Sequence, residues 1–262
     1  MEDQKIHQVK RTWSIYDHLP GNSVTILKRF WFKLGFSQEF GTLFRYEIDM
    51  LLLRLWCAVS LKHHRQVRQL RHRSRLRVQL GCGNALKSGW INLDCYPPLP
   101  RPDCEILTLD LRQKLPFVNN SVEAMYSEHF IEHVPLGLVR HLLLPECFRI
   151  LMPGGYIRVG VPDGEWWIGE YQLKKGDSEH HFTERSSDWL TWMMEINRVA
   201  RDSSHFYLYD YETLAALLSE IGFIELRKSY ANDSNIPCFI GIDQTDEWRM
   251  RTTVYIEGRR PE

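Results

Sequence analysis

Two neighbouring segments decide the fold: Arg75-Leu-Arg-Val-Gln-Leu-Gly-Cys-Gly-Asn84 and Gly89-Trp-Ile-Asn-Leu-Asp94. The first predicts a strand over Arg75–Leu80 that runs into a turn with two glycines. Glycine lets the backbone turn sharply and approach a ligand closely, because no side chain stands in the way. The second predicts a strand over Trp90–Asp94 whose final carboxylate can accept hydrogen bonds from both hydroxyls of a ribose. Together they predict a nucleotide-binding turn.

The glycine turn does not fit a nicotinamide site. The third glycine of a dinucleotide fingerprint is missing, and Asp94 follows the turn earlier than that fingerprint requires. This spacing argues against a nicotinamide-dependent oxidoreductase.

Strands and helices alternate beyond this turn, which predicts a parallel sheet with crossover connections. A helix is expected over Leu136–Leu151, interrupted or restarted by Pro145 and stopped at Pro153-Gly-Gly155. Two more helices are expected, one near Ser187–Arg201 and one over Tyr211–Glu220, the latter capped by Asp210 and ended by Gly222. The remaining strands are expected at Glu105–Asp110, Val122–Ser127, Tyr156–Val161, Phe223–Arg227 and Thr252–Glu257.

Residues 1–74 form a basic, aromatic-rich extension. Neither Gly nor Pro occurs from Tyr46 to about Arg73, which predicts one helix there. Large aliphatic side chains recur at helical spacing within it: Ile48, Leu51, Leu52, Leu55 and Val59. We expect this stripe to pack on the rest of the protein. The second half, Lys62–Arg77, has seven basic residues, three histidines and no acid. It is expected to be a solvated face or, alternatively, a contact surface for phosphorylated substrate, acidic lipid headgroups or nucleic acid.

The charge of the chain is unevenly distributed. The 262 residues have a formal net charge of zero, but residues 1–77 carry 15 basic and 6 acidic side chains, net +9, and residues 78–262 are net −9. Hydrophobic residues make up 44% and charged residues 25%, which excludes a disordered or low-complexity chain.

Cysteine usage and hydropathy indicate the compartment. The six cysteines are scattered without a C-x-x-C pair, so we expect reduced thiols rather than disulfides or a zinc site. Met1–Arg11 is polar, so no secretory signal is expected, and the most apolar stretch, Leu51–Leu61, is too short to span a bilayer. We therefore expect a cytoplasmic protein.

Three further motifs follow the glycine turn. They are Leu115-Pro-Phe-Val-Asn-Asn-Ser121, Glu128-His-Phe-Ile-Glu-His133 and Phe148-Arg-Ile-Leu-Met-Pro-Gly-Gly155. In this order and spacing the set resembles the class I S-adenosylmethionine-dependent methyltransferases, and within them a type 11-like group often associated with glycan biosynthesis. The resemblance implies a Rossmann-like α/β fold with a mostly parallel seven-stranded sheet, an antiparallel last strand and helices on both faces. It covers roughly residues 75–258, so we expect a methyltransferase domain over 75–262, with a lid-like insertion at about 164–204.

The resemblance also implies roles for particular residues in binding S-adenosyl-L-methionine. Gly81, Cys82 and Gly83 would lie against the methionine part, and Asp94 would hold the ribose. The adenine would be held by Asp110 and the Leu111 backbone, whereas Ser127 and His129 would face the methyl-bearing sulfonium. Only Asn84–Gly89 separates the first two strands, so the usual first helix must be shortened or absent.

Several histidines follow the fourth expected strand. His129, Glu132 and His133 have i, i+3, i+4 spacing, which places them on one helical face, and His205 is a candidate fourth group. We assign no metal here, because Glu132-His133 can simply stabilise the loop over the cofactor. Divalent-metal ligation is the alternative. A third interpretation makes His129 or His205 the general base that deprotonates an acceptor hydroxyl.

The expected function is methyl transfer from S-adenosylmethionine to O or N of a saccharide or other small molecule. The alternatives are an RNA methyltransferase that uses the basic N-terminal helix for phosphate contacts and a non-catalytic cofactor-binding scaffold protein.

Overall fold

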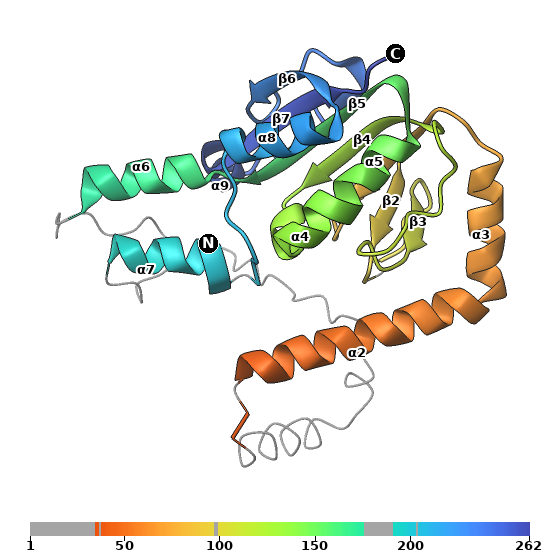
Figure 1. Cartoon of the computed structure of the whole chain (residues 1–262), viewed down its shortest axis with the longest axis horizontal. Coiled ribbons are helices and arrows are strands. Elements are labelled where there is room, and N and C mark those ends of the chain that lie inside the picture. The colour runs from red at the N-terminus through yellow and green to blue at the C-terminus, as the bar shows by residue number, and fades with distance from the viewer. Residues whose placement is uncertain (1–34, 37, 97–98, 176–190, 203) are drawn as a thin grey trace, which may run out of the picture.

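A seven-stranded sheet organises the molecule (Figure 1). The computed structural model describes residues 35–36, 38–96, 99–175, 191–202 and 204–262. The strand order is β3-β2-β1-β4-β5-β7-β6, with β1 to β5 parallel and β7 antiparallel to both of its neighbours. This confirms the expected mostly parallel sheet with an antiparallel last strand. The strands are β1 Leu76–Leu80, β2 Ile91–Asp94, β3 Glu105–Thr108, β4 Val122–Glu128, β5 Leu151–Pro162, β6 Ile224–Ser229 and β7 Thr253–Arg259.

Helices cover one face of the sheet. The expected helix at Leu136–Leu151 consists of α4 (Leu136–Leu138), a π-helical turn (η2, Val139–Leu143) and α5 (Leu144–Ile150), and Pro145 lies in the first turn of α5 as anticipated. Next to α5 lies α8 (Tyr211–Ile221), whose caps are those predicted. The Asp210 side chain accepts the Thr213 N–H at 2.8 Å, and Gly222 ends the helix at φ +105°.

A loop packs on the opposite face, where the sequence predicted helices. Phe239 and Ile242 of the segment 231–246 pack there against Trp90 and Tyr126, around the short 3-10 turn η4 (Pro237–Phe239). Neither the β1–β2 nor the β2–β3 connection contains a helix in its described residues, which leaves this face for the loop. The lack of a helix between β1 and β2 was expected, because only Asn84–Gly89 separates the two predicted strands.

Strand β5 begins five residues earlier than expected. The Pro153-Gly-Gly155 turn was predicted to lie between a helix and a strand, but it lies within β5, with Gly154 at φ +73°. The pairing of β4 with β5 shifts register between Val122 and Ala124, which accommodates the extra residues.

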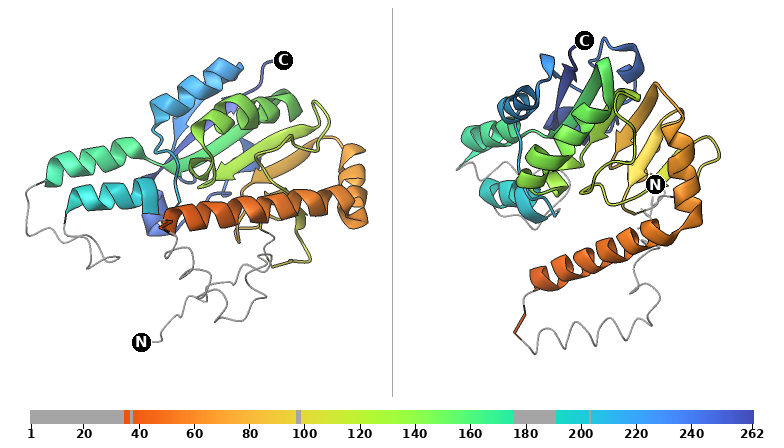
Figure 2. Two further views of the ribbon diagram at one scale, coloured as in Figure 1. Left: turned by 60° about the horizontal axis from the view of Figure 1, so that its bottom comes forward. Right: turned by 45° about the vertical axis from the view of Figure 1, so that its right-hand side comes forward.

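Within its described residues, 35–36 and 38–74, the N-terminal extension contains two helices where the sequence predicted one. Helix α2 (Gln38–Val59) ends before Ser60, which caps α3 (Leu61–Arg71) by accepting the His63 N–H at 3.2 Å. Figure 2 shows α2 running along the side of the sheet at which β2 and β3 end, with α3 turning back beside the strands. Among the described helices, none is long and apolar enough to cross a membrane.

Helix α2 packs by a different face from the one predicted. Met50 and Leu53 are buried, whereas Leu51, Leu55 and Val59 of the expected stripe are exposed. Aliphatic residues occur all round this helix, so their spacing could not select the inner face. Helix α3 joins the main core through Leu70.

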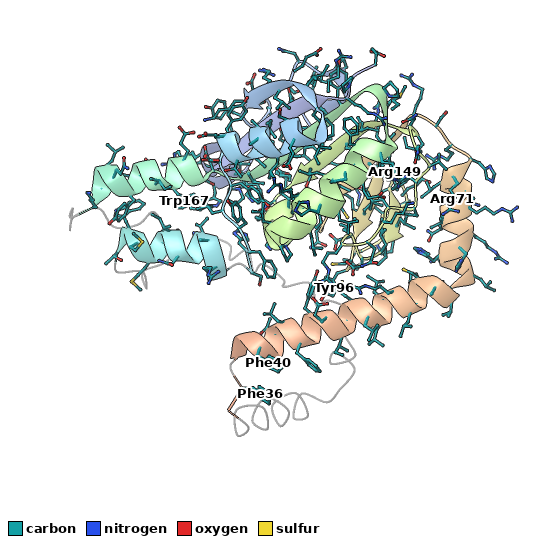
Figure 3. The ribbon with its side chains drawn as sticks, in the orientation of Figure 1. Phe36, Phe40, Arg71, Tyr96, Arg149 and Trp167 are labelled. Atoms are coloured by element: carbon teal, nitrogen blue, oxygen red, sulfur yellow. The ribbon has the colours of Figure 1, made fainter. Side chains whose placement is uncertain are left out.

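The insertion after β5 includes α6 (Gly164–Lys174) and α7 (Trp192–Asn197), which is followed by a second π-helical turn, η3 (Arg198–Asp202). Helices α6 and α7 lie side by side at one end of the sheet, as Figure 1 shows. The ring of Trp167 is buried against Trp248 of α9 (Glu247–Thr252), at a centroid distance of 5.2 Å; its position is labelled in Figure 3. Of the helix expected near Ser187–Arg201, the structure describes the part from α7 into η3. Residues 176–190 lie outside the described residues.

Candidate functional site

The glycine turn lies at the carboxyl end of β1, beside the end of β2. Gly81 has φ +63° and Gly83 has φ +48°, values at which an L side chain is strained. The Gly83 N–H donates to Asp94 Oδ2 at 2.8 Å, and the Tyr96 N–H donates to Asp94 Oδ1 at 2.9 Å. The sequence predicted that the glycine turn and Asp94 lie close together, and in the structure a hydrogen bond connects them.

The carboxylate of Asp94 is oriented and still able to bind. Each oxygen accepts one backbone N–H, and each retains a second lone pair for a ligand hydroxyl. Burial raises the pKa of Asp94, and the N–H groups of Tyr96 and Gly83 oppose that rise.

Two more of the expected cofactor residues, Cys82 and Ser127, lie in or beside the turn. Space next to Gly83 is open, because a Cβ placed there would have no neighbour within 4 Å, whereas a Cβ at Gly81 would overlap the Phe130 side chain. Cys82 is buried, and burial raises the pKa of its thiol, which disfavours a nucleophilic thiolate. The Ser127 hydroxyl at the end of β4 is buried and has no hydrogen-bond partner among the described residues. Such an orphaned polar atom fits a ligand contact.

Asp110, beyond the end of β3, is engaged by two arginines. Arg54 of α2 donates to Oδ2 from Nε at 2.8 Å, and its Nη2 lies 2.7 Å from the same oxygen. Arg112 donates to Oδ1 from its backbone N–H at 3.0 Å and from Nε at 3.1 Å. Burial raises the pKa of Asp110, but the hydrogen bonds from Arg112 and Arg54 outweigh it, and the net pKa lies below its usual range. An adenine amino group would therefore have to replace an arginine contact, and the adenine role of Asp110 and of buried Leu111 stays a prediction.

Further contacts hold α2 across this end of the sheet. Arg112 Nη1 donates to Glu47 at 2.6 Å, the Tyr96 hydroxyl donates to Asp49 at 3.4 Å, and the Cys57 thiol donates to the Thr108 carbonyl at 3.6 Å. Sequence reasoning missed the roles of Arg54 and Arg112. The partner of Arg54, Asp110, lies 56 positions further along the chain, so no local pattern could reveal it.

His129 is held by two neighbours. It adopts φ +51°, its Nε2 lies 2.8 Å from the Thr253 hydroxyl, and its Nδ1 lies 3.3 Å from Glu132 Oε1. The ring is thus oriented between β7 and the turn after β4, as an imidazole that passes a proton needs to be.

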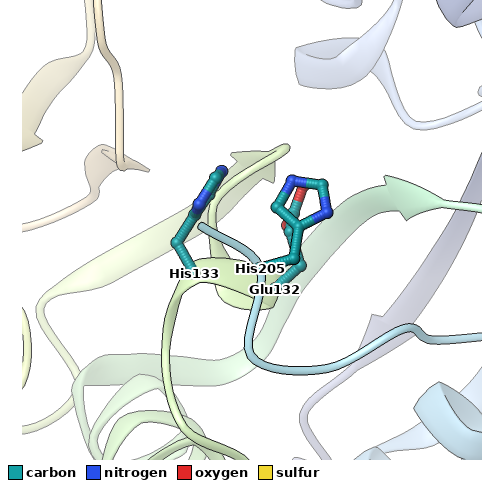
Figure 4. Close-up of side chains that lie close together, drawn as sticks. All are labelled: Glu132, His133 and His205. Carbon is teal, nitrogen blue, oxygen red and sulfur yellow. The ribbon is translucent and has the colours of Figure 1, made fainter. Parts of the chain in front are cut away.

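Glu132, His133 and His205 come together although they lie on two separate segments (Figure 4). Their ligand-type atoms lie within 4.8 Å of one another, and the rings of His133 and His205 are 4.6 Å apart. His205 Nδ1 contacts the Val199 carbonyl, and burial lowers the pKa of His205, which favours the neutral imidazole. The predicted proximity of His205 to Glu132-His133 is therefore present.

Comparisons with known proteins bear on this architecture. Residues 78–159 match the family model described as a methyltransferase domain. No curated protein matches the chain.

Three of the solved structures that match this chain are the following. A SAM-dependent methyltransferase from Archaeoglobus fulgidus is 14% identical, with 78% of this chain and 93% of that chain covered and a TM-score of 0.46. A possible histamine N-methyltransferase from Thermotoga maritima is 18% identical, with 79% of this chain and 93% of that chain covered and a TM-score of 0.45. The third is phosphoethanolamine N-methyltransferase 2 from Haemonchus contortus, in complex with S-adenosyl-L-methionine. It is 12% identical, with 76% of this chain and 53% of that chain covered and a TM-score of 0.44. Likeness at this level says nothing about the acceptor.

Proposed function

We propose that this chain is an S-adenosylmethionine-dependent methyltransferase. The observation that carries the proposal is the Gly81–Gly83 turn, bonded through the Gly83 N–H to the Asp94 carboxylate at the adjoining strand ends. Ligands of open α/β sheets bind at the carboxyl ends of the strands, where the order of strands reverses, and this turn follows β1 at such a point. The family match over 78–159 supports the same function.

The residues present fit this cofactor. Asp94 would accept hydrogen bonds from the two ribose hydroxyls with its remaining lone pairs, and the open space at Gly83 would admit the amino-acid end. The unpartnered Ser127 hydroxyl would meet a polar group near the sulfur. The bound cofactor supplies a methyl group that its sulfonium already activates for transfer.

Little is then required of the protein's side chains beyond positioning and proton removal. His129 is the proposed base, because Thr253 and Glu132 orient its ring, and His205 is the second candidate, because burial lowers its pKa. The proposed acceptor is a hydroxyl or amine of a saccharide or other small molecule, bound beside α6 and α7. This acceptor class and the link to glycan assembly come from the sequence motifs.

Asp94→Ala tests the cofactor assignment. We expect calorimetric titration of S-adenosylhomocysteine into the full chain to show at least a tenfold loss of affinity, because two charge-assisted hydrogen bonds disappear. Asp103→Ala is the matched control, since Asp103 is an exposed acid of the following loop that bonds Arg101. Equal affinity in Asp94→Ala and the wild type would overturn the assignment. Cofactor binding without methyl transfer to any acceptor would favour the scaffold alternative.

A further inference from the structure

Glu132 is a buried carboxylate without a compensating hydrogen bond. Its side chain is 1% exposed, and neither oxygen has a hydrogen-bond partner among the described residues. Burying an ionised carboxylate is costly unless a cation or several donors compensate it. His129 Nδ1 lies 3.3 Å from Oε1, but without forming a hydrogen bond to it. A buried carboxylate whose oxygens accept no hydrogen bond is the kind of group that a bound cation compensates.

Two imidazoles stand next to this carboxylate. His133 and His205 each bond a backbone carbonyl through Nδ1, to Ser204 and to Val199 respectively, which leaves Nε2 of each ring available. A carbonyl at Nδ1 fixes the tautomer in which Nδ1 carries the proton and Nε2 the lone pair. This is the arrangement that metal-bound histidines have in proteins.

We propose that Glu132, His133 and His205 bind one divalent transition-metal ion. Two imidazoles and one carboxylate are the ligands that Zn²⁺, Fe²⁺ and Co²⁺ prefer, and three protein ligands leave a position open. Ligand atoms on one such ion lie about 3.4 Å apart. Because the three groups already lie within 4.8 Å, an adjustment of the half-buried imidazoles completes the site.

The open position deepens the proposed function. Resting on that function, the ion would bind an oxygen or nitrogen of the methyl acceptor and lower the pKa of its proton, which places metal-binding hydroxyl compounds among the substrates. His129, held at Thr253, lies outside the ligand set and beside it.

Titration with Co²⁺ tests the site in the full chain without cofactor. We expect one ion per chain in the chelator-treated protein, with d–d absorption bands of nitrogen and oxygen ligation and without thiolate charge-transfer bands. Glu132→Gln and His205→Gln should weaken binding by about 100-fold or more, since each removes a ligand. His141→Gln, an exposed histidine elsewhere, should bind Co²⁺ like the wild type.

The stability of the metal-free protein supplies a second readout. Glu132→Gln removes a buried carboxylate whose oxygens accept no hydrogen bond, so it should raise the unfolding midpoint in the presence of chelator while it abolishes Co²⁺ binding. Co²⁺ binding that survives in Glu132→Gln and His205→Gln, or that carries thiolate bands, would refute the site. Failure of the Asp94→Ala test would leave this result unaffected, because no cofactor is present.

A second observation concerns the outward face of α2. Its solvent-facing aliphatic residues, here called the outer stripe, have exposed fractions of 48% for Leu51, 39% for Leu52, 54% for Leu55 and 77% for Val59. The face opposite to them packs on the domain through Met50 and Leu53. Soluble monomers seldom expose so continuous an apolar surface, which marks an interaction site.

Charge indicates the kind of partner. From Met50 to Leu93 the chain has no Asp or Glu, and Lys62, Arg65 and Arg68 are exposed on the helix that follows the stripe. An apolar strip that continues into cations fits an anionic lipid surface, which supplies both hydrocarbon and negative headgroups. A second copy fits poorly, because it would bring like-charged helices together.

We propose that the outer stripe and the start of α3 dock on a membrane surface containing anionic lipids. The full chain should co-sediment with vesicles of phosphatidylcholine and phosphatidylglycerol and much less with phosphatidylcholine alone. Leu51→Gln with Leu55→Gln should reduce the bound fraction at least fivefold, and Lys62→Gln with Arg65→Gln should remove the preference for anionic vesicles. Leu173→Gln is the control, because Leu173 is an even more exposed leucine on α6, outside the outer stripe.

Other occupants would give different results. A wild-type chain that sediments no better than its stripe variant contradicts the proposal. So does a dimer in light scattering that the stripe variant dissociates, which would indicate a second copy. Salt-sensitive RNA retention without vesicle binding would likewise overturn it and favour a nucleic-acid partner.

Discussion

Replacing Gly81 by alanine perturbs the turn in two separable ways. Its φ of +63° costs an alanine about 1–2 kcal/mol. The new Cβ would also lie less than 3.0 Å from the Cβ and Cγ of Phe130. These atoms are the base of that side chain, so the ring cannot swing aside at its far end, and forced overpacking costs about 1–3 kcal/mol more. We therefore expect Gly81→Ala to lower the free energy of unfolding by about 2–5 kcal/mol.

Gly83→Ala is the matched control within the same turn. Its φ is +48°, so the backbone cost is similar, but a Cβ there would meet nothing within 4 Å. We expect it to lose only about 1–2 kcal/mol. Urea denaturation of both variants, followed by circular dichroism, measures the difference, and an unchanged m-value would show that unfolding exposes the same surface.

A double-mutant cycle isolates the overlap. In a Phe130→Gly background both the Cβ and the Cγ of the clash are gone, so Gly81→Ala should cost only its backbone strain, leaving a coupling energy of about 1–3 kcal/mol. Equal losses in Gly81→Ala and Gly83→Ala, or a coupling near zero, would refute the reasoning.

Two further predictions concern ion pairs. Arg158→Met removes a fully buried guanidinium that bonds Asp243 at 2.6 Å and Glu257 at 2.7 Å, and the two carboxylates left without it should lower the free energy of unfolding in urea by about 3–5 kcal/mol. Arg140→Met, at an exposed ion pair with Glu220, should lower it by only about 0–1 kcal/mol. Similar losses in both variants would contradict this. Asp110, with its pKa held below the usual value near 4, stabilises the fold above that pH, and this stabilisation is lost as the pH falls through the lowered pKa of the folded state. In Asp110→Asn, the free energy of unfolding should therefore fall less steeply between neutral pH and about pH 2 than in the wild type. Parallel curves of unfolding free energy against pH for the variant and the wild type would disprove the role of the two arginines.

Features encoded by neighbouring residues could be read from the sequence. The turn after β1, the acid at the end of β2, and the caps Asp210 and Gly222 depend on backbone preferences within a few positions, and each was predicted where it occurs. The break at Ser60 was local as well, since serine is a good helix cap, but the absence of Gly and Pro concealed it.

Other features exist only because distant segments meet. Because aliphatic residues occur on all sides of α2, their pattern does not show which face is buried. The ion pair of Arg54 with Asp110, which follows β3, fixes that orientation. The same holds for His205, which reaches Glu132 through a loop that returns from the insertion.

By itself, then, the amino-acid sequence determined the order of the strands along the chain, the nucleotide-type turn and the division of charge between a basic extension and an acidic remainder. Only the tertiary structure decided which face of α2 is buried, what engages Asp110 and which groups surround Glu132. The physical reason is that backbone preferences act over a few residues, whereas ion pairs, buried carboxylates and exposed apolar faces are set by packing between segments far apart in the chain.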